Sequence, residues 1–94
     1  MYIQAVKNEV KEGMMEAYIL AAKGFAEDLG KVDGCKDAGV YVENSADDNY
    51  VSIVSSWESI EQMESQTALD TFLNHKALLR PHFVGNTTSI LRLV

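Results

Sequence analysis

Hydrophobic residues recur with two different periods along this chain, and each change of period marks a new element. Over residues 2–10 apolar and polar side chains alternate, and one face is apolar except for two amides, which predicts a half-buried strand. After a turn at Gly13, apolar residues recur at spacings of three and four. This second pattern predicts an amphipathic helix that begins at Met14 and ends near Gly30.

Alternation then returns in two short segments. Residues 37–43 and residues 50–57 both alternate, and the polar cluster of residues 44–49 between them is typical of a turn. We therefore predict a β-hairpin in the middle of the chain.

The second helical region is predicted to be broken. Ser59 and Gln62 have the spacing of a capping box, and a polar stretch at residues 65–67 interrupts the helical pattern before it resumes. Pro81 stops the helix. Residues 87–94 are rich in β-branched and apolar side chains and predict a closing strand.

The predicted order β-α-β-β-α-β, with its second helix broken, is that of a ferredoxin-like α+β fold, in which both helices cover one face of an antiparallel sheet. Such a sheet leaves its other face uncovered. We therefore expect a homodimer formed through the open sheet face.

Composition limits the class of protein. With 94 residues, 47% of them hydrophobic, the chain is expected to be one domain spanning residues 1–94. It has no apolar run long enough for a membrane span and no pattern of a secretory signal. A single cysteine, Cys35, excludes an internal disulfide framework and a multi-cysteine metal site. These features predict a cytoplasmic protein.

The charge narrows the choice of partner. Fourteen acidic residues against eight basic ones give a net charge of −6, and the basic residues are scattered. Such a surface repels nucleic acid and anionic membranes, so we expect neither as a partner. A small hydrophobic or aromatic molecule fits this charge better.

Four features in order carry a resemblance to a known family. They are the strand-to-turn run from Tyr2 to Gly13, the turn at Gly34 and Cys35, the strand that ends in Trp57-Glu58, and the later helix with Phe72. Together these features resemble the antibiotic biosynthesis monooxygenase family over essentially the whole chain. The resemblance implies a dimeric α+β barrel with a pocket between the sheet and the helices of each subunit.

The family includes cofactor-free oxygenases of quinols and aromatic polyketides, and a branch that degrades haem. The resemblance thus implies a monooxygenase, an oxidoreductase that uses its substrate as the reductant and needs no cofactor and no metal. The sequence agrees, since it contains neither a nucleotide-binding glycine motif nor a cluster with metal-ligand spacing.

Three residues are candidates for catalysis. Asn8 lies on the apolar face of the first strand, where it could contact substrate or simply bond the backbone. Trp57 ends the third strand, as a pocket wall or as a core aromatic. His75 lies three residues after Phe72 and is the candidate proton acceptor, the alternative being a solvated or structural histidine.

The candidate substrate pocket adds residues from both helices and the first strand. Gln66 stands where many relatives carry histidine and the haem-degrading branch carries tryptophan, which weighs against haem degradation. The alternative for Gln66 is a polar residue in a helix break. The predicted pocket residues are Val6, Tyr18, Met63, Gln66 and Phe72.

Two functions stay open. The first is cofactor-independent monooxygenation of a small aromatic or quinol-type substrate. The second is a non-catalytic dimer on the same fold that binds a small ligand or has a structural role. Residues filling the gap between sheet and helices would favour the second.

Overall fold

A computed structural model describes residues 1–44 and 48–94 of the chain. Four strands form one antiparallel sheet, in the spatial order β2-β3-β1-β4. The strands are β1 (Tyr2–Val10), β2 (Cys35–Tyr41), β3 (Tyr50–Trp57) and β4 (Phe83–Arg92). Part of the polar turn predicted over residues 44–49 lies outside the described residues.

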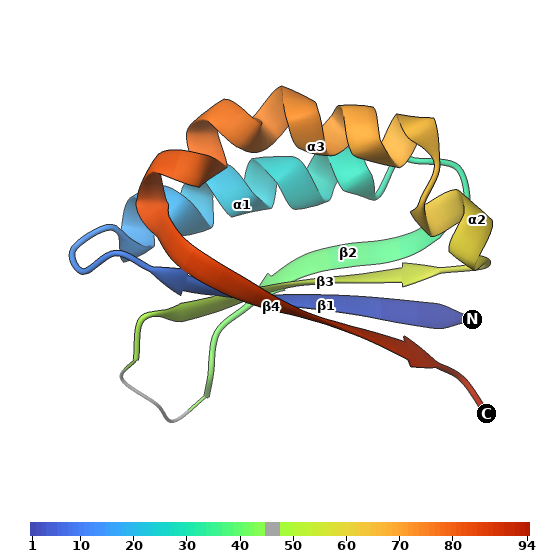
Figure 1. Ribbon diagram of the computed structural model, residues 1–94, viewed down its shortest axis with the longest axis horizontal. Helices are drawn as coiled ribbons and strands as arrows, with labels where there is room; N and C mark the ends of the chain where they lie inside the picture. Colours follow the sequence, from blue (N-terminus) through green and yellow to red (C-terminus); the bar gives the residue numbers. More distant parts are fainter. Residues whose placement is uncertain (45–47) are drawn as a thin grey trace.

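Both long helices cover the same face of this sheet (Figure 1). They are α1 (Met15–Leu29) and α3 (Gln66–Leu79), and the short α2 (Ile60–Met63) and the 3-10 turn η1 (Arg80–His82) flank α3. The element order and layers confirm the predicted ferredoxin-like α+β fold with a broken second helix.

Serine caps produce the break between α2 and α3. The hydroxyl of Ser59 accepts a hydrogen bond from the backbone N–H of Gln62 at 3.2 Å, as the capping-box spacing predicts. One turn later, the hydroxyl of Ser65 accepts from the N–H of Ala68 at 3.2 Å and starts α3. Because Ser65 has extended backbone angles, the helical path is interrupted there and α3 begins as a separate helix.

The boundaries of the outer strands differ from the prediction. β2 begins at Cys35 and ends at Tyr41, two residues earlier at each end than predicted. β4 begins at Phe83, four residues before the predicted start, because Phe83 pairs with Val10 directly after η1. The register shifts between Glu9, which pairs with Gly85, and Val10, which pairs with Phe83, so Val84 is the extra residue of this irregularity.

Alternation along the two central strands separates a covered face from an open one. The even-numbered residues of β1 and the odd-numbered residues of β3 point toward the helices, as their register confirms. The core lies on that side, with Val10, Tyr18, Ala22, Val51 and Trp57 almost fully buried.

Candidate functional site

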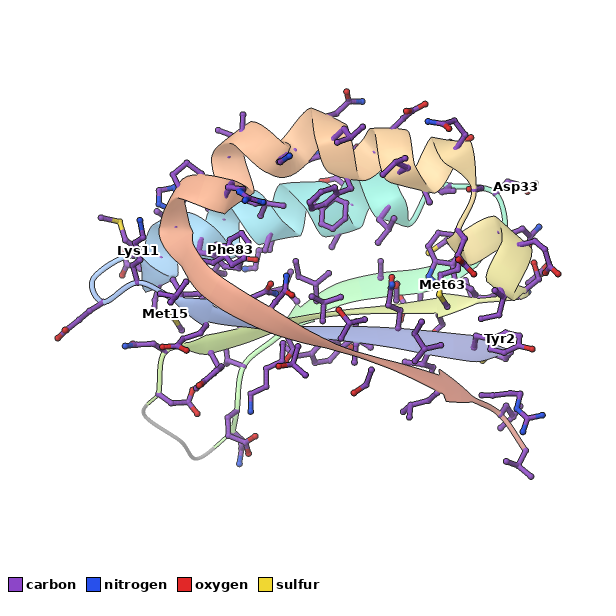
Figure 2. The ribbon with its side chains drawn as sticks, viewed as in Figure 1. Tyr2, Lys11, Met15, Asp33, Met63 and Phe83 are labelled. Carbon is purple, nitrogen blue, oxygen red and sulfur yellow. The ribbon has the colours of Figure 1, made fainter. Side chains whose placement is uncertain are left out.

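A cavity of about 410 Å³ lies between the helices and the β1–β4 half of the sheet. This volume lies within the range of small-molecule sites. Large apolar side chains form most of its wall, among them Tyr18, Phe25, Trp57, Met63, Phe72 and Phe83. In Figure 2, Met63 and Phe83 lie between the helices and the sheet at opposite ends of the molecule.

The cavity is closed on one side and open on the other. Its lining residues on β3 are buried, whereas Phe72 on α3 and Asn86 and Thr88 on β4 are exposed. The mouth therefore lies between α3 and β4. A ligand entering there would reach the wall at Trp57 last.

Asn8 lies in the floor of the cavity and is 3% exposed. Its amide nitrogen donates to the carbonyl oxygens of Val6 and Val51, both at 3.1 Å. These two acceptors fix the orientation of the amide, because its oxygen in that place would face two other oxygens. The Oδ1 atom of Asn8 is thus the atom left to accept a hydrogen bond from a ligand.

Trp57 forms the inner wall and is 1% exposed. Its indole N–H donates to the hydroxyl of Ser55 at 2.9 Å, two residues back on the same face of β3. Trp57 therefore presents an apolar ring to the cavity and no free donor. Ser55, which accepts that bond, keeps its own O–H for donation.

Tyr18 on α1 is the buried ionisable group of the described lining. Burial raises the pKa of its phenol to about 12. Tyr18 therefore stays protonated near neutral pH, where its O–H can donate a hydrogen bond but cannot act as a base.

Charged side chains lie at the mouth. Lys76 from α3, Arg80 from η1 and Glu64 from the α2–α3 junction line the cavity, and all three are exposed. The interior offers amides, hydroxyls and aromatic rings.

Two predicted site residues lie outside this cavity. The imidazole of His75 points to α1, where its Nε2 lies 2.7 Å from Oδ2 of Asp28 in a separate groove of about 280 Å³. Gln66, in the first turn of α3, is exposed and donates to Oδ1 of Asp70 at 2.8 Å. The structure therefore does not bring Gln66 and His75 together with the other predicted residues.

The structure brings the other predicted residues together. Asn8, Trp57, Val6, Tyr18, Met63 and Phe72 all line the one cavity. Sequence reasoning missed four polar members of the floor and wall, namely Gln4, Ser55, Asn86 and Thr88. A signal existed for Gln4 and Ser55, since each is a polar residue on the apolar face of an alternating strand.

Within residues 1–44 and 48–94, no three histidine, cysteine or carboxylate side chains gather as a group that could hold a metal ion. In the same residues, no helix has the length and apolar character needed to cross a membrane.

Fold and site together define a small α+β protein with a ligand-sized, largely aromatic cavity beneath its second long helix. The model of the antibiotic biosynthesis monooxygenase family matches residues 1–78, and the chain belongs to this family. No curated protein matches the chain.

Solved structures share the fold. A structure described as an antibiotic biosynthesis monooxygenase superimposes with a TM-score of 0.82 at 14% identity, over 100% of this chain and 99% of that one. A conserved protein from Methanosarcina mazei gives 0.82 at 24% identity, over 98% and 92% of the two chains. A protein of unknown function from Bacteroides thetaiotaomicron, described as a possible oxidoreductase, gives 0.76 at 16% identity, over 96% and 94%.

Proposed function

We propose that this protein is a cofactor-independent monooxygenase of a small aromatic or quinol-type substrate, bound in the cavity between β1, β4 and α3. The cavity of about 410 Å³, walled by aromatic rings and floored by amides and hydroxyls, carries this proposal. Membership in the antibiotic biosynthesis monooxygenase family supports it.

The reaction balances with the substrate as the reductant. A hydroquinone and one O₂ give a hydroxyquinone and one water, so the substrate supplies all four electrons that O₂ takes up. One oxygen atom enters the ring and the other leaves as water. The protein must bind the ring, favour its electron-rich anion and keep bulk water out.

The proposed roles follow from position. Asn8 accepts a hydrogen bond from a substrate hydroxyl through Oδ1, and this bond pushes electron density toward the ring. Trp57 packs against the ring as the inner wall. The proton released from the substrate leaves through the mouth, where the exposed carboxylate of Glu64 and solvent can take it.

One observation favours a second candidate function, the binding of an aromatic ligand without turnover. The described cavity lining offers no buried base, because Tyr18 stays protonated and Glu64 lies at the exposed mouth. A purely structural role is less well supported, since Trp57, Met63 and Phe72 leave a cavity between them.

Oxygen uptake by metal-free protein tests the proposal. With a panel of hydroquinones and anthrones, we expect uptake above the spontaneous rate, with one water formed for each oxygen atom inserted. Binding without uptake would support the second candidate. An intact fold that neither binds nor oxidises any compound would overturn both.

We also propose that the protein is a homodimer joined through the open sheet face. This face carries half-buried and exposed apolar side chains, among them Ile3, Ala5, Val54 and Leu91, and no helix or strand of the described residues covers it (Figure 1). A second copy of the same face would bury them. Sedimentation should show a dimer that Val54→Asp dissociates and that Leu20→Asp, on exposed α1 surface, leaves intact. A monomeric wild type would overturn this proposal.

A further inference from the structure

The charge at the cavity mouth is concentrated at one end. Lys76 and Arg80 are four residues apart, so their side chains lie on the same side of the helical segment, facing the cavity. The acidic lining residue, Glu64, precedes α3, which advances about 15 Å from its first residue to Lys76. The mouth is therefore basic at one end and acidic at the other.

Among the residues that the structure describes, neither basic side chain has a counter-ion. In residues 1–44 and 48–94 the ion pairs of lysine are those of Lys31 with Asp28 and of Lys36 with Glu58, and Lys76 and Arg80 take no part in them. This is notable in a chain with fourteen acidic residues and only eight basic ones. Two unpaired like charges side by side repel, and a bound anion would relieve that repulsion.

The basic end lies over the polar part of the floor. Val10 pairs with Phe83, the residue directly after η1, so the end of α3 lies over the far end of β1. There Asn8 pairs with Asn86 across β1 and β4, and both line the cavity.

The opposite end carries the indole ring of Trp57. Trp57 is paired with Tyr2 at the start of β1, and Met63 ends α2 beside it. The two ends of the cavity thus differ in charge: two cationic side chains lie at one end, and the Trp57 ring, with Gln4 and Ser55 close by, lies at the other.

We propose that the ligand of this cavity is an aromatic anion, a hydroquinone that carries a carboxylate. Its carboxylate lies between Lys76 and Arg80, and its ring extends toward Trp57. This inference rests on the proposed function and narrows its substrate class. Arginine suits the role because its planar guanidinium can donate two parallel hydrogen bonds to one carboxylate.

A matched pair of probes tests this inference. Naphthalene-1,4-diol and 1,4-dihydroxy-2-naphthoate differ only in the carboxylate, and their binding can be measured by calorimetry without oxygen and at low salt. We expect the wild-type protein to bind the carboxylate at least tenfold more tightly. This preference should shrink as salt is added, because exposed charges are screened.

Charge-removing variants locate the effect. The double variant Lys76→Gln/Arg80→Gln should lose the tenfold preference, because its affinity for the carboxylate should fall far more than its affinity for the uncharged diol. Each single variant should lose part of the preference, which keeps the test informative if the double variant does not fold. Lys23→Gln is the control, since Lys23 is an exposed lysine of α1 outside the cavity lining.

Three results would overturn the inference. They are equal wild-type affinity for the two probes, equal weakening of both probes in the double variant, and a preference that Lys23→Gln reduces as much. If the diol binds and consumes oxygen in any of these cases, the proposed monooxygenase function stands without this inference. If neither probe binds to folded protein, this inference falls, and the panel of hydroquinones and anthrones decides separately whether the proposed function falls too.

Discussion

Helices α1 and α3 lie over the same face of the sheet (Figure 1), yet they cover it differently. α1 packs on β2 and β3, whereas α3 packs chiefly against α1. α1 buries five residues, and α3 buries only Ala68 and Leu79 while leaving Leu69, Phe72 and Leu73 exposed.

This difference indicates that the two halves of the sheet have different roles, one in stability and the other in ligand binding. The half of the sheet beneath α1 is filled by apolar side chains, as expected of a core. Beneath α3, β1 and β4 carry amides and hydroxyls, and the cavity separates these side chains from the helix. The first half supports the fold, and the second leaves room for a ligand.

The largest expected effect is a difference in stability between variants at two phenylalanines. Phe25 of α1 and Phe72 of α3 are in edge-to-face contact, with ring centroids 6.0 Å apart. Phe25 is 8% exposed, so Phe25→Ala should lower the free energy of unfolding by about 3–5 kcal/mol. Phe72 is 39% exposed, and Phe72→Ala should cost less than about 1.5 kcal/mol. Urea denaturation measures both, with Leu20→Ala as the exposed control.

Phe72→Ala should in turn weaken ligand binding, because Phe72 lines the mouth side of the cavity. Equal losses of stability in the two variants would show that α3 contributes as much to the core as α1.

The next effect concerns Asn8, whose buried amide lies in the half of the sheet beneath α3. Asn8→Ala removes the donor to two carbonyl oxygens and should cost about 1–3 kcal/mol of stability. It should also slow oxygen uptake. Asn74→Ala, on the exposed surface of α3, serves as control and should change neither. Wild-type turnover by folded Asn8→Ala would remove Asn8 from the proposed mechanism.

A smaller effect on stability is expected at the hydrogen bond between Trp57 and Ser55 on β3. Ser55→Ala deprives the Trp57 indole N–H of its acceptor, and we expect a loss of about 1 kcal/mol, since the cavity can supply a water instead. Ser52→Ala, on the opposite face of the same strand, is the matched control. A more stable Ser55→Ala protein would contradict the importance of this bond.

The smallest effect on stability is expected at the hydrogen bond between His75 of α3 and Asp28 of α1. The hydrogen bond from His75 holds the pKa of Asp28 below its ordinary value of 3.8, with a further contribution from Lys31. A lowered carboxyl pKa stabilises the fold above the ordinary value, and this contribution is lost as the pH falls through the lowered one.

Asp28→Asn should therefore lower the melting temperature slightly at neutral pH and not at about pH 2, well below the ordinary carboxyl pKa. Asp33→Asn in the following turn is the control. A difference that persists unchanged in acid would show that the Asp28 charge is not responsible.

Much of the fold was predictable because burial imposes its period on the sequence. Alternation identified both central strands, β1 and β3, and the residues that share each of their faces. The capping-box spacing at Ser59 predicted the start of the second helical region, and the polar stretch at residues 65–67 predicted its break. The start of β4 was missed, because Gly85 and Asn86 are poor strand formers. Pairing with β1 overrides that local preference.

The site was predictable where strands form it and less so where α3 does. A strand has two faces, so Asn8 among apolar neighbours had to face the core. On α3, both His75 and Lys76 lie next to Phe72 on the helix surface, three and four residues further along, so the sequence alone does not show which of them faces the cavity. The rotation of α3 about its axis turns Lys76 toward the cavity and His75 toward Asp28, and tertiary packing sets that rotation.

The strand order has a consequence for how this protein folds. β1 has no neighbour from the adjacent part of the chain, because its partners are β3 and β4, about 50 and 80 residues further on. Such high contact order predicts slow folding, since long loops must close before these pairs form. Both hydrogen-bonded edges of β1 thus depend on strands that are made later, and the cavity floor is complete only once β4 has docked.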